Sequence, residues 1–192
     1  MNLLNLKSML SFGVQDVAAT GGLTLPSAHV LCSRCVKDGR FLRLKRDFYI
    51  LAGNWEHYTP LKFMQIANRL QVPSYLSLTT ALAYHQITTQ VQRQWWESIS
   101  TRRSTVVQAG GATFVYHKLQ GDLYFGFTRQ DGIFIAEPEK AILDAAYFEV
   151  LGHGAIDWDA IDRGKIDKER YADYLARFPE RLRRRIRRKC RI

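Results

Sequence analysis

The residues of this 192-residue chain best suited to chemistry are polar and basic side chains that can bind nucleic acid. A first group near the N-terminus consists of Ser27, His29, Ser33, Arg34 and Lys37. Hydroxyl, imidazole, guanidinium and ammonium groups donate hydrogen bonds to base edges and phosphates in the major groove of DNA. A second group, Arg43, Lys45 and Arg46, follows shortly after, and such basic groups hold the phosphate backbone. We therefore expect this segment to bind double-stranded DNA.

Three short helices and a hairpin would position these residues. Apolar residues at helical spacing predict an amphipathic helix over the first dozen residues, and a second helix fits 14–19, before two glycines. Pro26 suits the first turn of a third helix, which we expect to end near Asp38 with Gly39 as its left-handed cap. The apolar stripe of this third helix comprises Ala28, Leu31, Cys32, Cys35 and Val36. Two strands with a basic turn follow, so residues 1–57 are predicted to form a winged helix-turn-helix domain.

The third helix also carries His29, Cys32 and Cys35 in the pattern H-x-x-C-x-x-C, which can supply zinc ligands. A structural zinc site needs a fourth ligand, however, and both cysteines lie on the apolar stripe, where a free thiol behaves as a small hydrophobic group. We therefore expect no metal and no other cofactor.

Residues 58–165 combine helical and strand patterns, which predicts an α+β fold. The expected helices run from Pro60 to shortly before Pro73, over 78–84, and from Pro138 to Gly152. The expected strands cover 104–109, 112–119, 122–127 and 133–135. Gly110 and Gly111 suit a two-residue hairpin turn between the first two of these strands. The sequence thus predicts a small antiparallel sheet beside helices.

Three segments of the chain, in this order, resemble the AbiEi family of antitoxins. They are Tyr75-Leu-Ser-Leu-Thr-Thr-Ala-Leu-Ala-Tyr-His85, Gly111-Ala-Thr-Phe-Val-Tyr116 and Ala136-Glu-Pro-Glu-Lys-Ala-Ile-Leu-Asp144. The last is the most specific and resembles the family's A-x-P-E-K-A-x-x-D box, and the resemblance covers roughly residues 1–150. It implies a transcriptional regulator that represses its own operon at inverted repeats. It also implies an antitoxin that counters a nucleotidyltransferase toxin, as part of a type IV system, without forming a stable complex with it.

The residues of this box, Pro138, Glu139, Lys140 and Asp144, also have a structural explanation. Glu139 would lie in the first turn of a helix, where the helix dipole favours a carboxylate, and Lys140 and Asp144 are four residues apart. A metal-dependent nuclease centre is the alternative, and it would use Asp122, Glu137, Glu139 and Lys140. Their spacing differs from the E-x-K pattern of restriction-type nucleases, so we do not expect an enzyme.

The C-terminal segment, residues 166–192, is predicted to form a helical tail rich in arginine. A helix begins near Lys168, and after Pro179 a last helix places Leu182, Ile186 and Cys190 on one narrow stripe. Its other positions include Arg181, Arg183, Arg184, Arg185, Arg187, Arg188 and Lys189. We interpret these residues as contacts for DNA or RNA; a solvated tail and an acidic protein partner are the alternatives.

Aromatic residues in the middle of the chain have two interpretations. Trp95 and Trp96, with Tyr75 and Tyr84, either stack on single-stranded nucleic acid or pack in the core, and we favour packing.

Charge and composition agree with a DNA-binding protein. The net charge is +10, and it is concentrated at the two ends: +4 over 1–55, −2 over 56–176 and +8 over 177–192. No apolar run is long enough to span a membrane, no signal peptide is evident, and the chain has three cysteines, so a cytoplasmic protein is expected. The predicted function is sequence-specific repression of transcription. The alternative is a protein-interaction module that binds a toxin or other partner directly.

Overall fold

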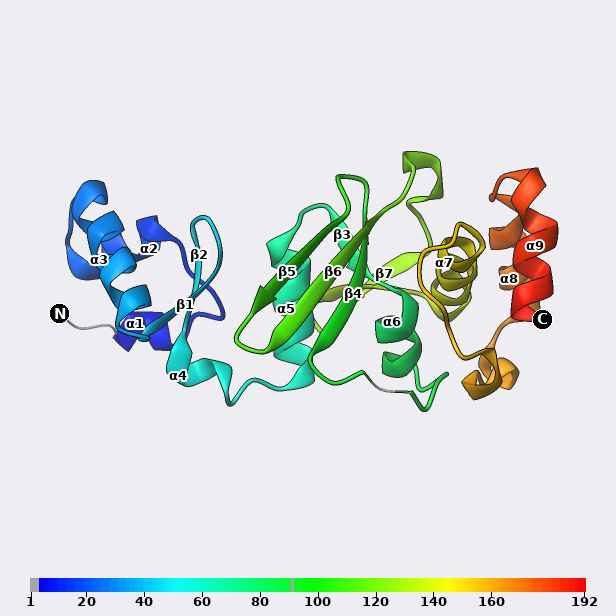
Figure 1. Cartoon of the computed structure of the whole chain (residues 1–192), viewed down its shortest axis with the longest axis horizontal. Coiled ribbons are helices and arrows are strands. Elements are labelled where there is room, and N and C mark those ends of the chain that lie inside the picture. Colours follow the sequence, from blue (N-terminus) through cyan, green and yellow to red (C-terminus); the bar gives the residue numbers. More distant parts are fainter. Residues whose placement is uncertain (1–3, 91) are drawn as a thin grey trace.

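The computed structural model describes residues 4–90 and 92–192 and has an α+β fold. Along the longest axis of the molecule, a helical N-terminal part is followed by a sheet with its helices and then by a C-terminal group of helices (Figure 1). In the described part of the chain, no helix has the length and apolar character needed to cross a membrane.

The N-terminal part contains three helices and a hairpin. The helices are α1 (Leu4–Lys7), α2 (Val14–Gly21) and α3 (Leu25–Lys37), and the hairpin is formed by β1 (Phe41–Lys45) and β2 (Phe48–Leu51). The side chain of Thr24 accepts a hydrogen bond from the Ser27 amide and caps α3, while Gly22 ends α2 in the left-handed conformation. The second and third predicted helices and both predicted strands are confirmed.

The first helix is shorter than predicted. It ends at Lys7, and residues 1–3 lie outside the described part of the chain. Phe12 instead pairs with Tyr49 as an added bridge of the hairpin, with two backbone hydrogen bonds of 2.9 Å. The prediction was wrong here because apolar spacing alone cannot distinguish a helix from an apolar residue recruited to a sheet edge.

The central part is built on a sheet that has six strands among the described residues, in the order β5-β6-β4-β3-β8-β7. The strands are β3 (Ser74–Leu76), β4 (Trp95–Ser100), β5 (Thr105–Ala109), β6 (Ala112–Lys118), β7 (Phe127–Gln130) and β8 (Ile133–Ala136). Strand β3 is parallel to β8, and β4 is parallel to β6, whereas the other pairs are antiparallel. The predicted small antiparallel sheet is thus corrected to a larger mixed sheet.

Two further predictions about strands need correction. The segment 122–127 is not a strand: Gly121–Leu123 forms a 3-10 helix, and β7 begins only at Phe127. Strands β3 and β4 were missed because β3 has only three residues and both are largely buried, so neither shows the alternation of an exposed strand.

Helices pack around this sheet and form one continuous core with it. The helices are α4 (Ala52–Trp55), α5 (Pro60–Leu70), α6 (Leu78–Tyr84), α7 (Pro138–Val150), α8 (Lys168–Ala176) and α9 (Glu180–Cys190). Helix α7 is buried along nearly its whole length, and α8 and α9 pack against it at the C-terminal end (Figure 1). The core that begins at Leu44 extends to Cys190, so the C-terminal helices share it.

The N-terminal part has a smaller core of its own, and its hairpin also packs against the sheet and its helices. Trp55 donates a hydrogen bond of 2.8 Å from Nε1 to the carbonyl oxygen of Gly110, in the turn between β5 and β6. Tyr58 donates another, of 3.1 Å, to the carbonyl oxygen of Leu10. Strand β1 also contacts β5. These contacts fix the hairpin against the edge of the sheet.

The two glycines of this turn provide a matched test of the junction. Gly110 and Gly111 have φ values of +55° and +81°, so alanine is strained at both positions. At Gly110 a Cβ would also collide with the Trp55 indole and lie 2.8 Å from Leu42 Cδ2, whereas at Gly111 it would meet open space. We expect Gly110→Ala to lower the free energy of unfolding by about 1–3 kcal/mol more than Gly111→Ala does, measured by urea unfolding. Equal losses would show that Trp55 does not pack closely on this turn.

Candidate nucleic-acid interface

The exposed face of α3 carries all five predicted base-contacting residues. They are Ser27, His29, Ser33, Arg34 and Lys37, and each is exposed. The opposite face packs inward, because Ala28, Cys32 and Cys35 are fully buried against α1, α2 and the hairpin. Helix α3 lies at the N-terminal end of the molecule, and the hairpin lies between it and the sheet (Figure 1).

The polar groups on this face are not equally available. Ser33 donates a hydrogen bond of 3.0 Å to the carbonyl oxygen of His29, and Ser27 accepts one from the hydroxyl of Thr24. Arg34 and Lys37 form no ion pair with any described residue. The cations are therefore the strongest available donors on the helix.

Val30 is a further residue on this face that the sequence analysis did not identify. Its side chain is 59% exposed, which is unusual for valine on a helix whose other face is well packed. At 100° per residue it lies between Arg34 and Lys37 on the helical wheel. An apolar side chain between two cations can contact the methyl group of thymine. The signal in the sequence was a valine that falls outside the apolar stripe.

The hairpin places its three basic residues differently from one another. Arg43, Lys45 and Arg46 are all exposed, but only Lys45 reaches across to the central part of the molecule. Lys45 donates a hydrogen bond of 2.5 Å to the carbonyl oxygen of Leu70, at the end of α5. Partial burial, followed by the nearby charge of Arg102, lowers the pKa of Lys45. Its side chain is thus turned toward the central part of the molecule and would have to move to reach a phosphate.

A second basic surface is formed by α9. Leu182, Ile186 and Cys190 form the predicted stripe and are buried against the C-terminal core. Three of the basic side chains make contacts within the molecule: Arg183 with the Phe178 carbonyl, Arg185 with the Val150 carbonyl and Lys189 with the Glu149 carboxylate. Arg181, Arg184, Arg187 and Arg188 are exposed and form no ion pair with the described residues.

The box residues Lys140 and Asp144 form a buried ion pair on α7. Both side chains are fully buried, and Asp144 also accepts hydrogen bonds from Tyr75 at 3.0 Å and Ser77 at 2.8 Å. Burial lowers the pKa of Lys140, and the Asp144 carboxylate opposes that effect. Burial, and then Asp144, raise the pKa of the Tyr75 hydroxyl well above its usual range.

Aromatic rings surround the ammonium group of this pair. The Nζ atom of Lys140 lies 5.5 Å from the centroid of the Tyr75 ring, 5.2 Å from that of Phe125 and 5.5 Å from that of Phe178. Ring faces attract a cation, so the three rings partly compensate for the hydration that the Lys140 ammonium group loses on burial.

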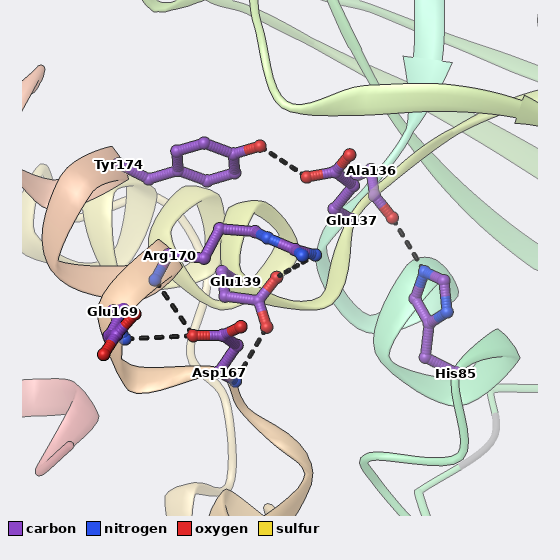
Figure 2. Close-up of polar contacts among 8 residues, drawn as sticks. All are labelled: His85, Ala136, Glu137, Glu139, Asp167, Glu169, Arg170 and Tyr174. Carbon is purple, nitrogen blue, oxygen red and sulfur yellow. Dashed lines mark hydrogen bonds and ion pairs between the residues drawn. The ribbon is translucent and has the colours of Figure 1, made fainter.

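The carboxylates beside this pair connect α7 to α8, as Figure 2 shows. Glu139 is buried, accepts a hydrogen bond of 2.9 Å from the amide of Asp167 and lies 3.7 Å from Arg170 Nη1. Glu137 accepts a hydrogen bond of 2.5 Å from Tyr174. The Asp167 side chain in turn caps α8 by accepting from the amides of Glu169 and Arg170. Pro138 stands in the first turn of α7. Through these contacts the box residues hold α8 against α7, which is a structural role.

The alternative interpretation, a metal-dependent nuclease centre, has no matching cluster of side chains in residues 4–90 and 92–192. No group of three or more His, Cys, Asp or Glu side chains there is arranged to hold a metal ion. Of the nuclease set, Glu139 and Lys140 are buried and engaged, and Asp122 is exposed on the 3-10 helix. That the chain is not an enzyme stays a prediction.

The cysteines are buried as free thiols. Burial is the main cause that raises the pKa of Cys32 and Cys35, and it raises that of Cys190 to about 11. A high pKa keeps a thiol protonated near neutral pH, and it then neither attacks nor coordinates readily.

The aromatic residues are divided between core and surface. Tyr75 is fully buried and Trp96 is 9% exposed, whereas Trp95 is 37% exposed. Trp95, Trp96 and Tyr84 line an apolar cavity of about 450 Å³ together with residues of α5, α6 and the segment 92–94. Packing thus accounts for Tyr75 and Trp96, and the cavity leaves Trp95 and Tyr84 accessible.

No protein-family model matches the chain, and no curated protein is significantly similar to it. The resemblance to AbiEi antitoxins stays a prediction based on the three segments named above.

The buried ion pair provides a test of the structural role of the box. Lys140→Met would leave the Asp144 carboxylate buried with only two hydroxyl donors, so we expect the free energy of unfolding to fall by about 3–5 kcal/mol. Arg40→Met removes an exposed pair with Asp38 and is the control, with an expected change of less than about 1 kcal/mol. Urea unfolding of both variants measures this difference. A similar small loss for both would contradict the structural role.

Proposed function

We propose that this chain is a transcriptional repressor that binds double-stranded DNA through α3. One observation carries the proposal: α3 packs on the smaller N-terminal core and exposes Val30, Arg34 and Lys37 on its other face. Cations on this face can contact phosphates or guanine, and the valine can contact thymine. A rigid helix that offers donors and an apolar contact on one face is suited to reading the major groove.

The elements around α3 support a winged helix-turn-helix interpretation. Helix α2 precedes α3 after a short turn, and the hairpin β1–β2 follows at once, with Phe12 added to its edge. Arg43 and Arg46 would hold the phosphate backbone beside the groove. Lys45, which contacts Leu70, would have a smaller part in binding.

Repression would follow from occupation of a promoter. The resemblance to AbiEi antitoxins suggests inverted repeats upstream of the protein's own gene as the binding site. A helix that reads base edges discriminates among sequences, whereas the phosphate contacts strengthen binding to any duplex.

DNA binding can be tested with a double variant of α3. We expect wild-type protein to prefer its own upstream DNA over a scrambled duplex, and Arg34→Ala/Lys37→Ala to weaken upstream binding by about tenfold or more and reduce the salt slope by about 2. The control Lys118→Ala/Arg129→Ala removes the same charge from exposed positions on β6 and β7 and should bind as the wild type does. Fluorescence anisotropy across a salt series measures these affinities. Unchanged binding by the α3 variant would exclude α3 as the contact.

A second candidate is a protein-interaction module that binds a toxin or another partner directly. The apolar cavity beside the exposed Trp95 favours it, because such hollows accept apolar side chains of a partner. Both candidates can be compared by co-expressing this chain with a nucleotidyltransferase toxin encoded beside it. Antitoxin activity of the type IV kind predicts that growth is rescued while the two proteins do not co-purify. Co-purification would favour the interaction module, and failure to rescue would contradict an antitoxin role.

A further inference from the structure

The two basic helices of this protein lie at opposite ends of its longest axis (Figure 1). Helix α3 packs its apolar face inward on α1, α2 and the hairpin, and α9 packs its apolar face inward on α7 and α8. Their exposed faces are therefore directed away from each other. One straight duplex that lies on the polar face of α3 cannot also lie on the arginine face of α9.

The arginine face of α9 carries charge that the rest of the chain does not neutralise. Arg181, Arg184 and Arg188 are three or four residues apart, and Arg187 lies beside them on the same exposed side. Like charges at this spacing destabilise an isolated helix. Of the nearby acidic residues, Glu149 is already engaged by Lys189, and Glu180, in the first turn of α9, forms no ion pair with the described residues and offsets only one of the arginine charges. Burial of Leu182, Ile186 and Cys190 thus keeps α9 folded although its exposed arginines repel one another.

A DNA duplex matches this array in charge and size. A helix of 11 residues is about 16 Å long, and the same length of duplex carries about ten negative charges. Guanidinium groups bind phosphate oxygens through two parallel hydrogen bonds. Since α9 is packed on the core, the backbone positions of its arginines are fixed before binding, which lowers the entropic cost of contact.

We propose that α9 binds a second segment of DNA, so that one molecule bridges two duplexes. This inference rests on the proposed binding of a first duplex by α3. Binding at α9 would depend on charge and not on sequence, because arginines predominate on this face, with Glu180 as its one carboxylate, and they contact phosphates. The protein would hold its specific site at one end and any neighbouring duplex at the other.

A capture experiment tests bridging directly. The upstream duplex is fixed to beads, protein is bound and unbound protein is washed away, and a fluorescent duplex of unrelated sequence is then added. We expect wild-type protein to capture the fluorescent duplex, and Arg184→Ala/Arg188→Ala to reduce capture at least about fivefold while it still binds the bead duplex. Lys118→Ala/Arg129→Ala is the control of equal charge and should capture as the wild type does. Circular dichroism and urea unfolding confirm that each variant is folded.

The outcomes separate this inference from the proposed function. Full capture by the α9 variant would overturn bridging through α9, including the case in which a dimer bridges through two copies of α3. Selective capture of a labelled RNA hairpin over the duplex would assign the surface to RNA and also overturn the proposal. If Arg34→Ala/Lys37→Ala still binds the bead duplex as tightly as wild type does, the assignment of specific binding to α3 fails, whatever α9 binds.

Discussion

The arrangement of the C-terminal half depends on one buried ion pair, between Lys140 and Asp144 on α7. Two fully buried charges are stable only when each is neutralised and hydrogen-bonded. Tyr75 and Ser77 supply the remaining hydrogen bonds to Asp144, and Phe178 places its ring near the Lys140 ammonium. The pair thus joins the sheet, α7 and the segment between α8 and α9. Apolar contacts alone would allow the neighbouring elements to shift along α7, whereas these polar contacts fix them at one position.

The sequence predicted those elements whose signals are local. The bounds of α3 and the turn at Gly110 follow from a cap, a proline and glycines, which act within a few residues. The sheet was predicted less well, because β3 pairs with β8 in parallel across about 60 residues and no local pattern encodes such a pairing. The failure at α1 has the same origin, since Phe12 pairs with the distant Tyr49.

The candidate interface shows the same division between local and distant information. Helical periodicity correctly separated the exposed and buried faces of α3, so all five predicted residues are exposed. Periodicity could not show that Lys45 is bonded to Leu70, because this contact joins the hairpin to α5 across 25 residues. It could have identified Val30, which departs from the apolar stripe, but a single valine on a polar face is weak as a signal.

The arginine-rich C-terminal segment was predicted to form a helical tail with one apolar stripe, and the structure confirms the last helix and buries that stripe in the core, which decides what its charges can do. A disordered basic tail reaches any nearby phosphate and adds to whichever contact comes first. Helix α9 cannot do so, because Leu182, Ile186 and Cys190 are buried in the core that also contains the sheet. Trp55 joins the N-terminal part to the same sheet through Gly110. The positions of α3 and α9 are therefore linked through packed elements. The separation of the two basic surfaces is then a property of the fold, and under the proposed function the charges of α9 would strengthen binding only to a duplex that lies on the far side of the molecule from α3.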